Sequence, residues 1–222
     1  MIHLFKSTFK IDWKYIVIEL VLIVAGILLA INLDNWSAAR KVRAETKVSI
    51  QKIREELSFN LKELREVNNI NSDLVEFLGM LDGVVGESQT GRLRASTEKL
   101  RELMQDYSDY FQVTDSTKVS DNEFDYHVDV YYQIEYAELN DIAWQTAQIS
   151  NAINAYKYDC LKEIISVYSF QELFTNIQNK FLDYGLLENF KQFVSTFQLY
   201  HKMSDELLQR YDSLNTDLSS CL

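Results

Sequence analysis

The sequence predicts an all-α protein: an N-terminal transmembrane helix that continues into a long helix, followed by a helical bundle with one extended segment. Three observations favour this class. The 222 residues include no proline and only six glycines, and proline is the residue that most often ends a helix. Residues 16–33 are apolar apart from Glu19 and Asn32. Beyond them, apolar residues recur every three or four positions from Ile50 to Leu81, which is the helical period.

The apolar segment has the length and the flanks of a membrane span. Its 18 residues correspond to about 27 Å of helix, close to the hydrocarbon thickness of a bilayer. Trp13 and Tyr15 precede it and Trp36 follows it, as in interfacial aromatic belts. A buried core helix rarely has such flanks, and a cleaved signal peptide needs small residues directly after its apolar part. We therefore predict an uncleaved transmembrane helix at residues 15–35, after a short basic tail at residues 1–14.

One face of this span is predicted to associate with another helix. Glu19, Gly26 and Ala30 fall on one stripe, and Gly26 and Ala30 form a small-xxx-small pair that permits close helix packing. A carboxylate on that stripe can hydrogen-bond across to a second span. The alternative is that Glu19 reaches the membrane interface, with Lys14 as its partner.

Charge is divided unevenly along the chain. Residues 1–65 carry 11 basic against 7 acidic side chains, whereas residues 66–222 carry 11 against 26. A basic region beside a span suits anionic lipid headgroups, and an acidic body argues against nucleic acid as a partner. Short basic tails resist translocation more than long domains do. We therefore expect the tail inside and the body outside the cytoplasm.

Residues 36–83 are predicted to form a long juxtamembrane helix with a coiled-coil-like seam. The seam includes Leu57, Asn60, Leu64 and Asn71, with the two asparagines at otherwise apolar positions. Two interpretations are equally compatible with it. The seam is either a coiled coil between chains or one face of a bundle within the chain.

Residues 84–222 are predicted to form a helical body. Glycines mark a loop at residues 83–91, and an amphipathic helix is expected at residues 93–111. Residues 124–136 alternate in polarity and are expected to be extended, with an acidic second face that we interpret as solvated. A short helix capped by Asn140 or Asp141 and ending at Ile149, a helix at residues 156–184 and a last helix at residues 187–218 follow. Cys160 and Cys221 have no metal or redox spacing and are expected to be buried or idle thiols.

Three stretches resemble a family of uncharacterised bacterial proteins with one N-terminal span and a helical body. They are GILLAINLDNWSAAR at residues 26–40, EELSFN at residues 55–60 and DIAWQTAQISNAI at residues 141–153. The resemblance implies an inner-membrane location and a helical fold. It implies no activity and no catalytic residues.

The sequence favours a membrane-anchored, non-enzymatic interaction or scaffold protein of the bacterial envelope. Its expected partners are the lipid bilayer and either further copies of itself or another membrane protein, through the span and the long helix. The alternative function is a sensor, in which a ligand-binding body signals through the span. No catalytic motif, cofactor motif or metal-ligand spacing is present in the sequence, so no cofactor is predicted.

Overall fold

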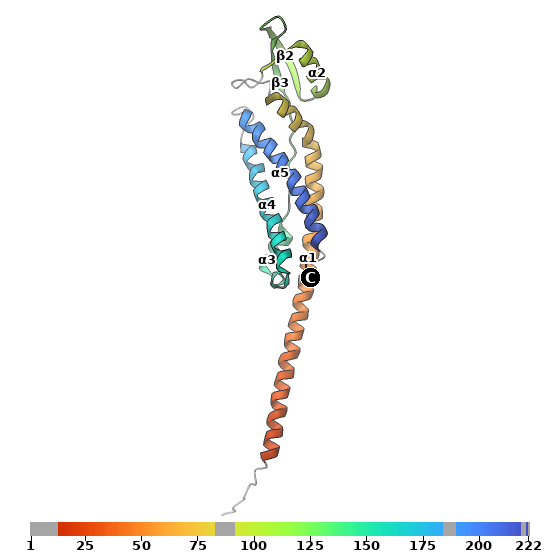
Figure 1. Ribbon diagram of the computed structural model, residues 1–222, viewed down its shortest axis with the longest axis vertical. Helices are drawn as coiled ribbons and strands as arrows, with labels where there is room; N and C mark the ends of the chain where they lie inside the picture. Colours follow the sequence, from red (N-terminus) through yellow and green to blue (C-terminus); the bar gives the residue numbers. More distant parts are fainter. Residues whose placement is uncertain (1–12, 83–91, 184–189, 219–220, 222) are drawn as a thin grey trace, which may run out of the picture.

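A single helix runs through most of the length of the molecule. The computed structural model describes residues 13–82, 92–183, 190–218 and 221, and its helix α1 spans Trp13–Asp82, which is 70 residues. At 1.5 Å per residue the helix is about 105 Å long. The first half of α1 projects alone from the body, and the second half packs within it (Figure 1). The predicted continuity of the apolar helix with the long helix after it is confirmed.

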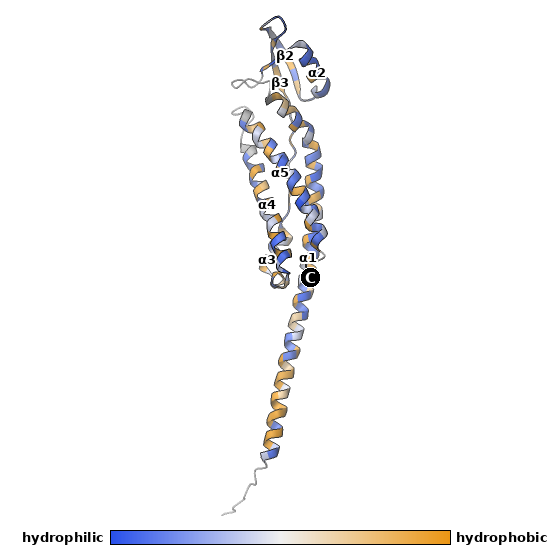
Figure 2. Ribbon diagram, viewed as in Figure 1, coloured by the Kyte–Doolittle hydropathy of each residue, from blue (hydrophilic) through white to orange (hydrophobic). Residues whose placement is uncertain are grey.

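The projecting half of α1 is the apolar half (Figure 2). It is the one helix among the described residues that is long and apolar enough to cross a membrane, and none of its 18-residue apolar window is buried within the chain. The first fully buried side chain along α1 belongs to Thr46. Trp36 and Thr46 are about 15 Å apart along the helix axis, so a short exposed stalk separates the apolar half from the body.

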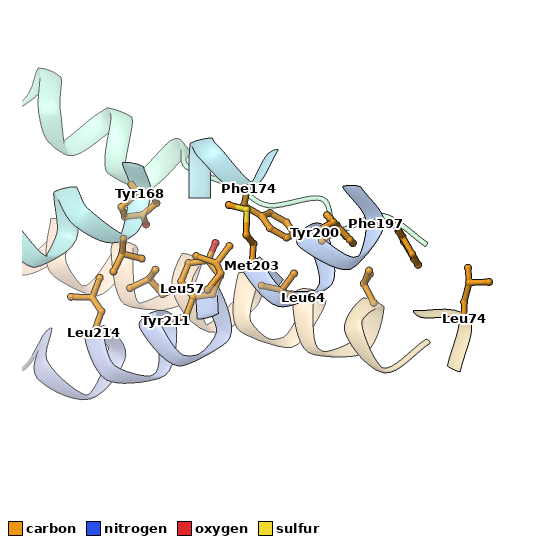
Figure 3. Close-up of a cluster of buried hydrophobic side chains, with 14 of the residues drawn as sticks. Leu57, Leu64, Leu74, Tyr168, Phe174, Phe197, Tyr200, Met203, Tyr211 and Leu214 are labelled. Carbon is orange, nitrogen blue, oxygen red and sulfur yellow. The ribbon is translucent and has the colours of Figure 1, made fainter. Parts of the chain in front are cut away.

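The body is a bundle of three long helices. The second half of α1 packs with α5 (Phe190–Asp217), which runs in the opposite direction, and α5 packs in turn with α4 (Tyr158–Asp183), which runs in the same direction as α1 (Figure 1). Figure 3 shows the core between them, in which leucines of α1 meet aromatic side chains of α4 and α5. The largest fully buried side chains include Leu57, Leu64, Phe174, Tyr200 and Tyr211.

A three-stranded antiparallel sheet lies at the end of the body farthest from the apolar half of α1. Its strands are β1 (Arg92–Ala95), β2 (Phe111–Lys118) and β3 (Phe124–Val130), in the order β1-β3-β2. The helix α2 (Thr97–Tyr107) connects β1 to β2. Phe77 of α1 is fully buried against the rings of Tyr107, Tyr110 and Phe111, at centroid distances of 5.5, 5.2 and 5.8 Å. This aromatic cluster fastens the sheet to the end of α1.

The sheet corrects the predicted all-α class and the predicted helix at residues 93–111. Leu93 and Ala95 are buried on alternate positions of a strand, and the helix begins only after Ser96, whose hydroxyl accepts a bond from the Lys99 amide at 3.1 Å. β3 lies inside the predicted extended segment and has two partners, because β1 and β2 flank it. The mainly helical character of the chain is as predicted.

After β3 the chain returns through the bundle as an extended segment, residues 131–141, without regular strand pairing. It ends at α3 (Ile142–Ile149), which is followed by the short 3₁₀ helix η1 (Asn151–Ala155). Both lie at the end of the body nearest the apolar half of α1 (Figure 1). α4 begins two residues later than expected, at Tyr158. The predicted glycine loop at residues 83–91 and the predicted end of the helix at residue 184 lie outside the described residues.

We expect a proline in the buried part of α1 to destabilise the body. Leu64→Pro removes a helical hydrogen bond and clashes with the preceding turn, at a cost of about 3 kcal/mol or more. Ala39→Pro is the matched control, because Ala39 lies in the same helix but is exposed in the stalk. Thermal unfolding of the full chain in detergent should show a lower midpoint for Leu64→Pro and a nearly unchanged one for Ala39→Pro. Equal midpoints would contradict the role of α1 in the core.

Candidate functional site

The predicted seam of the long helix faces the interior of the chain's own body. Leu57, Asn60 and Leu64 are 0% exposed and Asn71 is 1% exposed. α3, η1 and α5 pack against α1 along this stretch. Of the two interpretations that the sequence leaves open, the structure therefore shows the bundle within the chain. The seam is not available to a second chain unless the body opens.

The two seam asparagines hold the extended segment by pairing with its backbone. Asn71 Nδ2 donates to the Glu135 carbonyl at 2.8 Å, and Asn71 Oδ1 accepts from the Glu135 amide at 3.1 Å. Asn60 makes the same pair of bonds with Asn140, at 2.7 and 2.9 Å. A carboxamide that both donates to and accepts from one residue does what a neighbouring β-strand does. We call these two contacts the amide clamps.

Two glutamines of α4 also bond the backbone of the segment. Gln171 Nε2 donates to the Asn140 carbonyl at 3.1 Å, and Gln178 Nε2 donates to the Ala137 carbonyl at 3.3 Å. The oxygens of these glutamines accept bonds from buried tyrosine hydroxyls of α5, Tyr211 at 2.7 Å and Tyr200 at 3.3 Å. Burial raises the pKa of both tyrosines, so each hydroxyl remains a proton donor. Side chains of α1 and α4 therefore bond the segment directly, and tyrosines of α5 hold the two glutamines.

Glu56 of α1 caps the helix α3. Its carboxylate accepts bonds from the Ala143 amide at 2.7 Å and from the Trp144 amide at 3.4 Å, which are donors in the first turn of α3. It also accepts the Tyr168 hydroxyl at 2.6 Å. Burial, and then the Glu56 carboxylate, raise the pKa of Tyr168. Asp141 occupies the N-cap position as predicted but makes no capping bond with its side chain, because Glu56 takes the donors of the first turn.

The two cysteines form a disulfide, which corrects the predicted idle thiols. Cys160 near the start of α4 is bonded to Cys221, across 61 residues of sequence, with a Cα–Cα distance of 5.3 Å. That distance is in the usual range for disulfides. Closing a loop of this length is expected to stabilise the fold by about 4 kcal/mol. The spacing of the two cysteines in the sequence does not indicate this bond, because they meet only through the antiparallel packing of α4 and α5.

An open groove lies between α1 and α3, at the end of the body nearest the apolar half of α1. Its volume is about 740 Å³. Ala44 and Val48 of α1 and Ile142 of α3 give it apolar walls, while Lys52 and Thr146 supply polar groups. Val48 is 58% exposed and Ile142 68% exposed. Apolar walls with a few polar groups are typical of surfaces that bind a partner.

No part of the body that the structure describes covers the predicted association face of the span. Glu19, Gly26 and Ala30 are all exposed on the projecting half of α1. Nothing lies within 4 Å of the position that a Cβ of Gly26 would take. The structure therefore places these residues along one free helix face and leaves their association a prediction.

The acidic face predicted beside β3 makes an ion pair across the sheet. Arg94 of β1 donates two bonds to the Asp125 carboxylate, at 2.7 and 3.0 Å. The hydrogen bonds from Arg94 hold the pKa of Asp125 below its ordinary value. Within the part of the chain that the structure describes, no group of three or more His, Cys, Asp or Glu side chains is arranged to hold a metal ion.

Sequence reasoning identified both asparagines of the clamps but not their partners. Gln171 and Gln178 are seven residues apart in a helix, so they share a face with buried Phe174. Amide side chains on the buried face of a predicted helix are the sequence signal that could have identified these partners.

Comparisons with protein-family models, with curated proteins and with solved structures give no match to this chain. The resemblance seen in its sequence therefore stays a prediction, and its function is argued from geometry.

We expect Asn71→Asp to destabilise the body, although it hardly changes the size of the side chain. Aspartate keeps the shape of the side chain but cannot donate to the Glu135 carbonyl, and it brings a buried charge. A lost bond with an unsatisfied buried partner costs about 1–3 kcal/mol, and more for a charged group. Asn69→Asp is the control, because Asn69 is exposed two residues away. Urea unfolding should give a clearly lower midpoint for Asn71→Asp only, and equal midpoints would show that the clamp adds no stability.

Proposed function

We propose that this protein is a membrane-anchored scaffold of the bacterial envelope, which crosses the inner membrane once and presents a rigid helical body to partner proteins. The observation that carries the proposal is the unbroken helix α1. Its projecting half is apolar and is not buried by any described part of the chain, and its other half is part of the body's core. A helix without a hinge holds the body at a fixed height and direction above the membrane.

The disulfide supports a body outside the cytoplasm. Disulfides form and persist in oxidising compartments such as the bacterial periplasm and are rare in the cytoplasm. The Cys160–Cys221 bond joins the end of the chain to α4, so it belongs to the body. It adds to the charge argument, in which the short basic tail stays in the cytoplasm. The proposed location is thus the inner membrane, with the body in the periplasm.

The orientation can be tested with a reporter that fluoresces only in the cytoplasm. Fused after Leu222 it should stay dark, whereas the same reporter fused before Met1 should be bright. Thiol labelling of the unsubstituted chain gives a second readout: Cys160 and Cys221 should resist labelling until a reductant is added. A bright C-terminal fusion, or free thiols before reduction, would reverse the proposed orientation.

A ligand-binding sensor is the second candidate function, and the groove between α1 and α3 favours it. The groove has the size of a small-molecule site, and it touches the same helix that crosses the membrane. Purification of the full chain in mild detergent distinguishes the two candidates. A scaffold retains a reproducible set of proteins, whereas a sensor retains a small molecule that native mass spectrometry detects.

The scaffold function also predicts that the spans associate through the face of Glu19, Gly26 and Ala30. Gly26→Leu should push neighbouring spans apart, and Glu19→Ala should remove a hydrogen bond of about 0.6–2 kcal/mol. Glu19→Gln should be milder, because an amide still bridges helices. Oxidative crosslinking of an Ile23→Cys variant in membranes measures the contact.

Ala25→Leu is the matched control for this experiment. It adds the same bulk one residue away, about 100° around the helix from Gly26, and should leave crosslinking unchanged. Because no other described part of the chain lies within 4 Å of a Cβ added at Gly26, Gly26→Leu should not disturb the fold. Crosslinking that is insensitive to both Gly26→Leu and Glu19→Ala would make Glu19 an interfacial residue and refute span association.

A further inference from the structure

The stalk of α1 and its junction with the body carry a row of basic side chains that begins just above the apolar segment. Trp36 is followed by Arg40, Arg43 and Lys47, at intervals of four, three and four residues. Such intervals place side chains on one face of an α-helix. All four side chains are exposed. We call the three cations the basic stripe.

The basic stripe is not neutralised by the chain itself. Among the described residues, none of its three cations takes part in an ion pair or a side-chain hydrogen bond. The acidic side chains of this stretch, Asp34 and Glu45, each lie two residues before Trp36 or Lys47, and two residues turn a helix by about 200°. Glu45 is paired with Lys41, at 3.9 Å. Both acidic groups therefore lie on the other side of α1.

The guanidinium of Arg40 is held at the level of Trp36. Its central carbon, Cζ, lies 5.6 Å from the centroid of the Trp36 ring, which is one helical turn below Arg40. Side chains of a helix lean toward its N-terminus, and in α1 this is the direction of the apolar half. A cation over an indole ring is favourable. The contact leaves the N–H donors of Arg40 without an acceptor in the described chain.

This level coincides with the lipid headgroups when the apolar segment spans a bilayer. Trp36 is about 5 Å above Leu33, the last residue of the apolar segment, and a headgroup layer is about 5–8 Å thick. Arg43 is about 15 Å above Leu33. Its long side chain can extend toward the membrane, and the tilt of about 20° that is usual for spans brings it closer. Lys47 adds attraction that falls off over about 8–10 Å.

The rest of the molecule carries the opposite charge and lies farther from the membrane. Residues 66–222 have 26 acidic against 11 basic side chains. The body begins at Thr46, the first fully buried residue of α1, about 20 Å above Leu33. An anionic surface therefore attracts the stalk and repels the body. At the depth of Trp36, the anions at hand are lipid phosphates, which favours a lipid over an acidic protein as the ligand.

We propose that the basic stripe, together with Trp36, binds the phosphate groups of anionic phospholipids in the leaflet nearest the body. A guanidinium matches phosphate oxygens with two parallel hydrogen bonds, so arginine suits this ligand. The inference rests on the proposed function, because it requires α1 to cross a membrane. It does not depend on the side of the membrane on which the body lies.

Native mass spectrometry of the full chain tests this binding. The chain is placed in lipid nanodiscs that contain equal amounts of phosphatidylglycerol and phosphatidylcholine with the same acyl chains. The unsubstituted chain should retain phosphatidylglycerol in excess. Arg40→Gln should lower the ratio of the two retained lipids by roughly fivefold, which corresponds to about 1 kcal/mol for one basic side chain at an anionic surface. Adding Arg43→Gln should lower the ratio further.

Arg65→Gln is the matched control. Arg65 is an exposed arginine of the same helix, 18 residues after Lys47. Because 18 residues make five turns, it lies on the same face as the basic stripe but about 27 Å farther from the membrane than Lys47. The same loss of charge at this height should leave the lipid ratio unchanged. Circular dichroism checks that all variants keep their helices, as expected for exposed side chains.

The outcomes separate this inference from the proposed function. No excess of phosphatidylglycerol on the unsubstituted chain, or equal ratios for Arg65→Gln and the Arg40→Gln, Arg43→Gln double variant, would overturn the lipid site. An acidic protein that copurifies from native membranes and is lost in the double variant, without a lipid preference, would make the basic stripe a protein-binding surface and also overturn it. If these chains nevertheless resist extraction from membranes by alkaline carbonate, the proposed membrane anchor stands. Extraction of the unsubstituted chain would refute that anchor itself.

Discussion

The body depends on the hydrogen bonding of one extended segment in the middle of a helical bundle. Helices satisfy their own backbones, so they offer no donors or acceptors to a strand that passes between them. Ala137 of the segment is buried and several of its neighbours are half-buried, so backbone groups left without partners there would cost free energy. Side-chain amides solve this problem, because each carboxamide supplies the donor and the acceptor that a strand neighbour would supply. Asn60 and Asn71 of α1 do so, and Gln171 and Gln178 of α4 add a donor each. The position of α3 follows from where the segment ends.

This arrangement ties the apolar half of α1 to the body without a joint. α1 supplies both asparagine clamps, the cap of α3 through Glu56 and the aromatic contact with the sheet through Phe77. The disulfide joins the start of α4 to Cys221, just after α5. A tilt or rotation of the apolar half must therefore move the whole body with it. That property suits a scaffold that sets the position of a partner. It equally allows a movement of the body to be transmitted along α1 to its apolar half.

The sequence predicted the helices better than the partners that hold them. The continuous α1 followed from its uniform period and the lack of proline, which are local properties. β1 was missed because four residues are too short to show a period. The pairing of β3 was missed because its partners are separated from it along the chain, β1 by α2 and β2, and β2 by a turn. The clamps needed two facts that no local pattern contains: which helix Asn60 and Asn71 face, and that a strand passes between. The cysteines illustrate the same limit, since a separation of 61 residues carries no spacing signal.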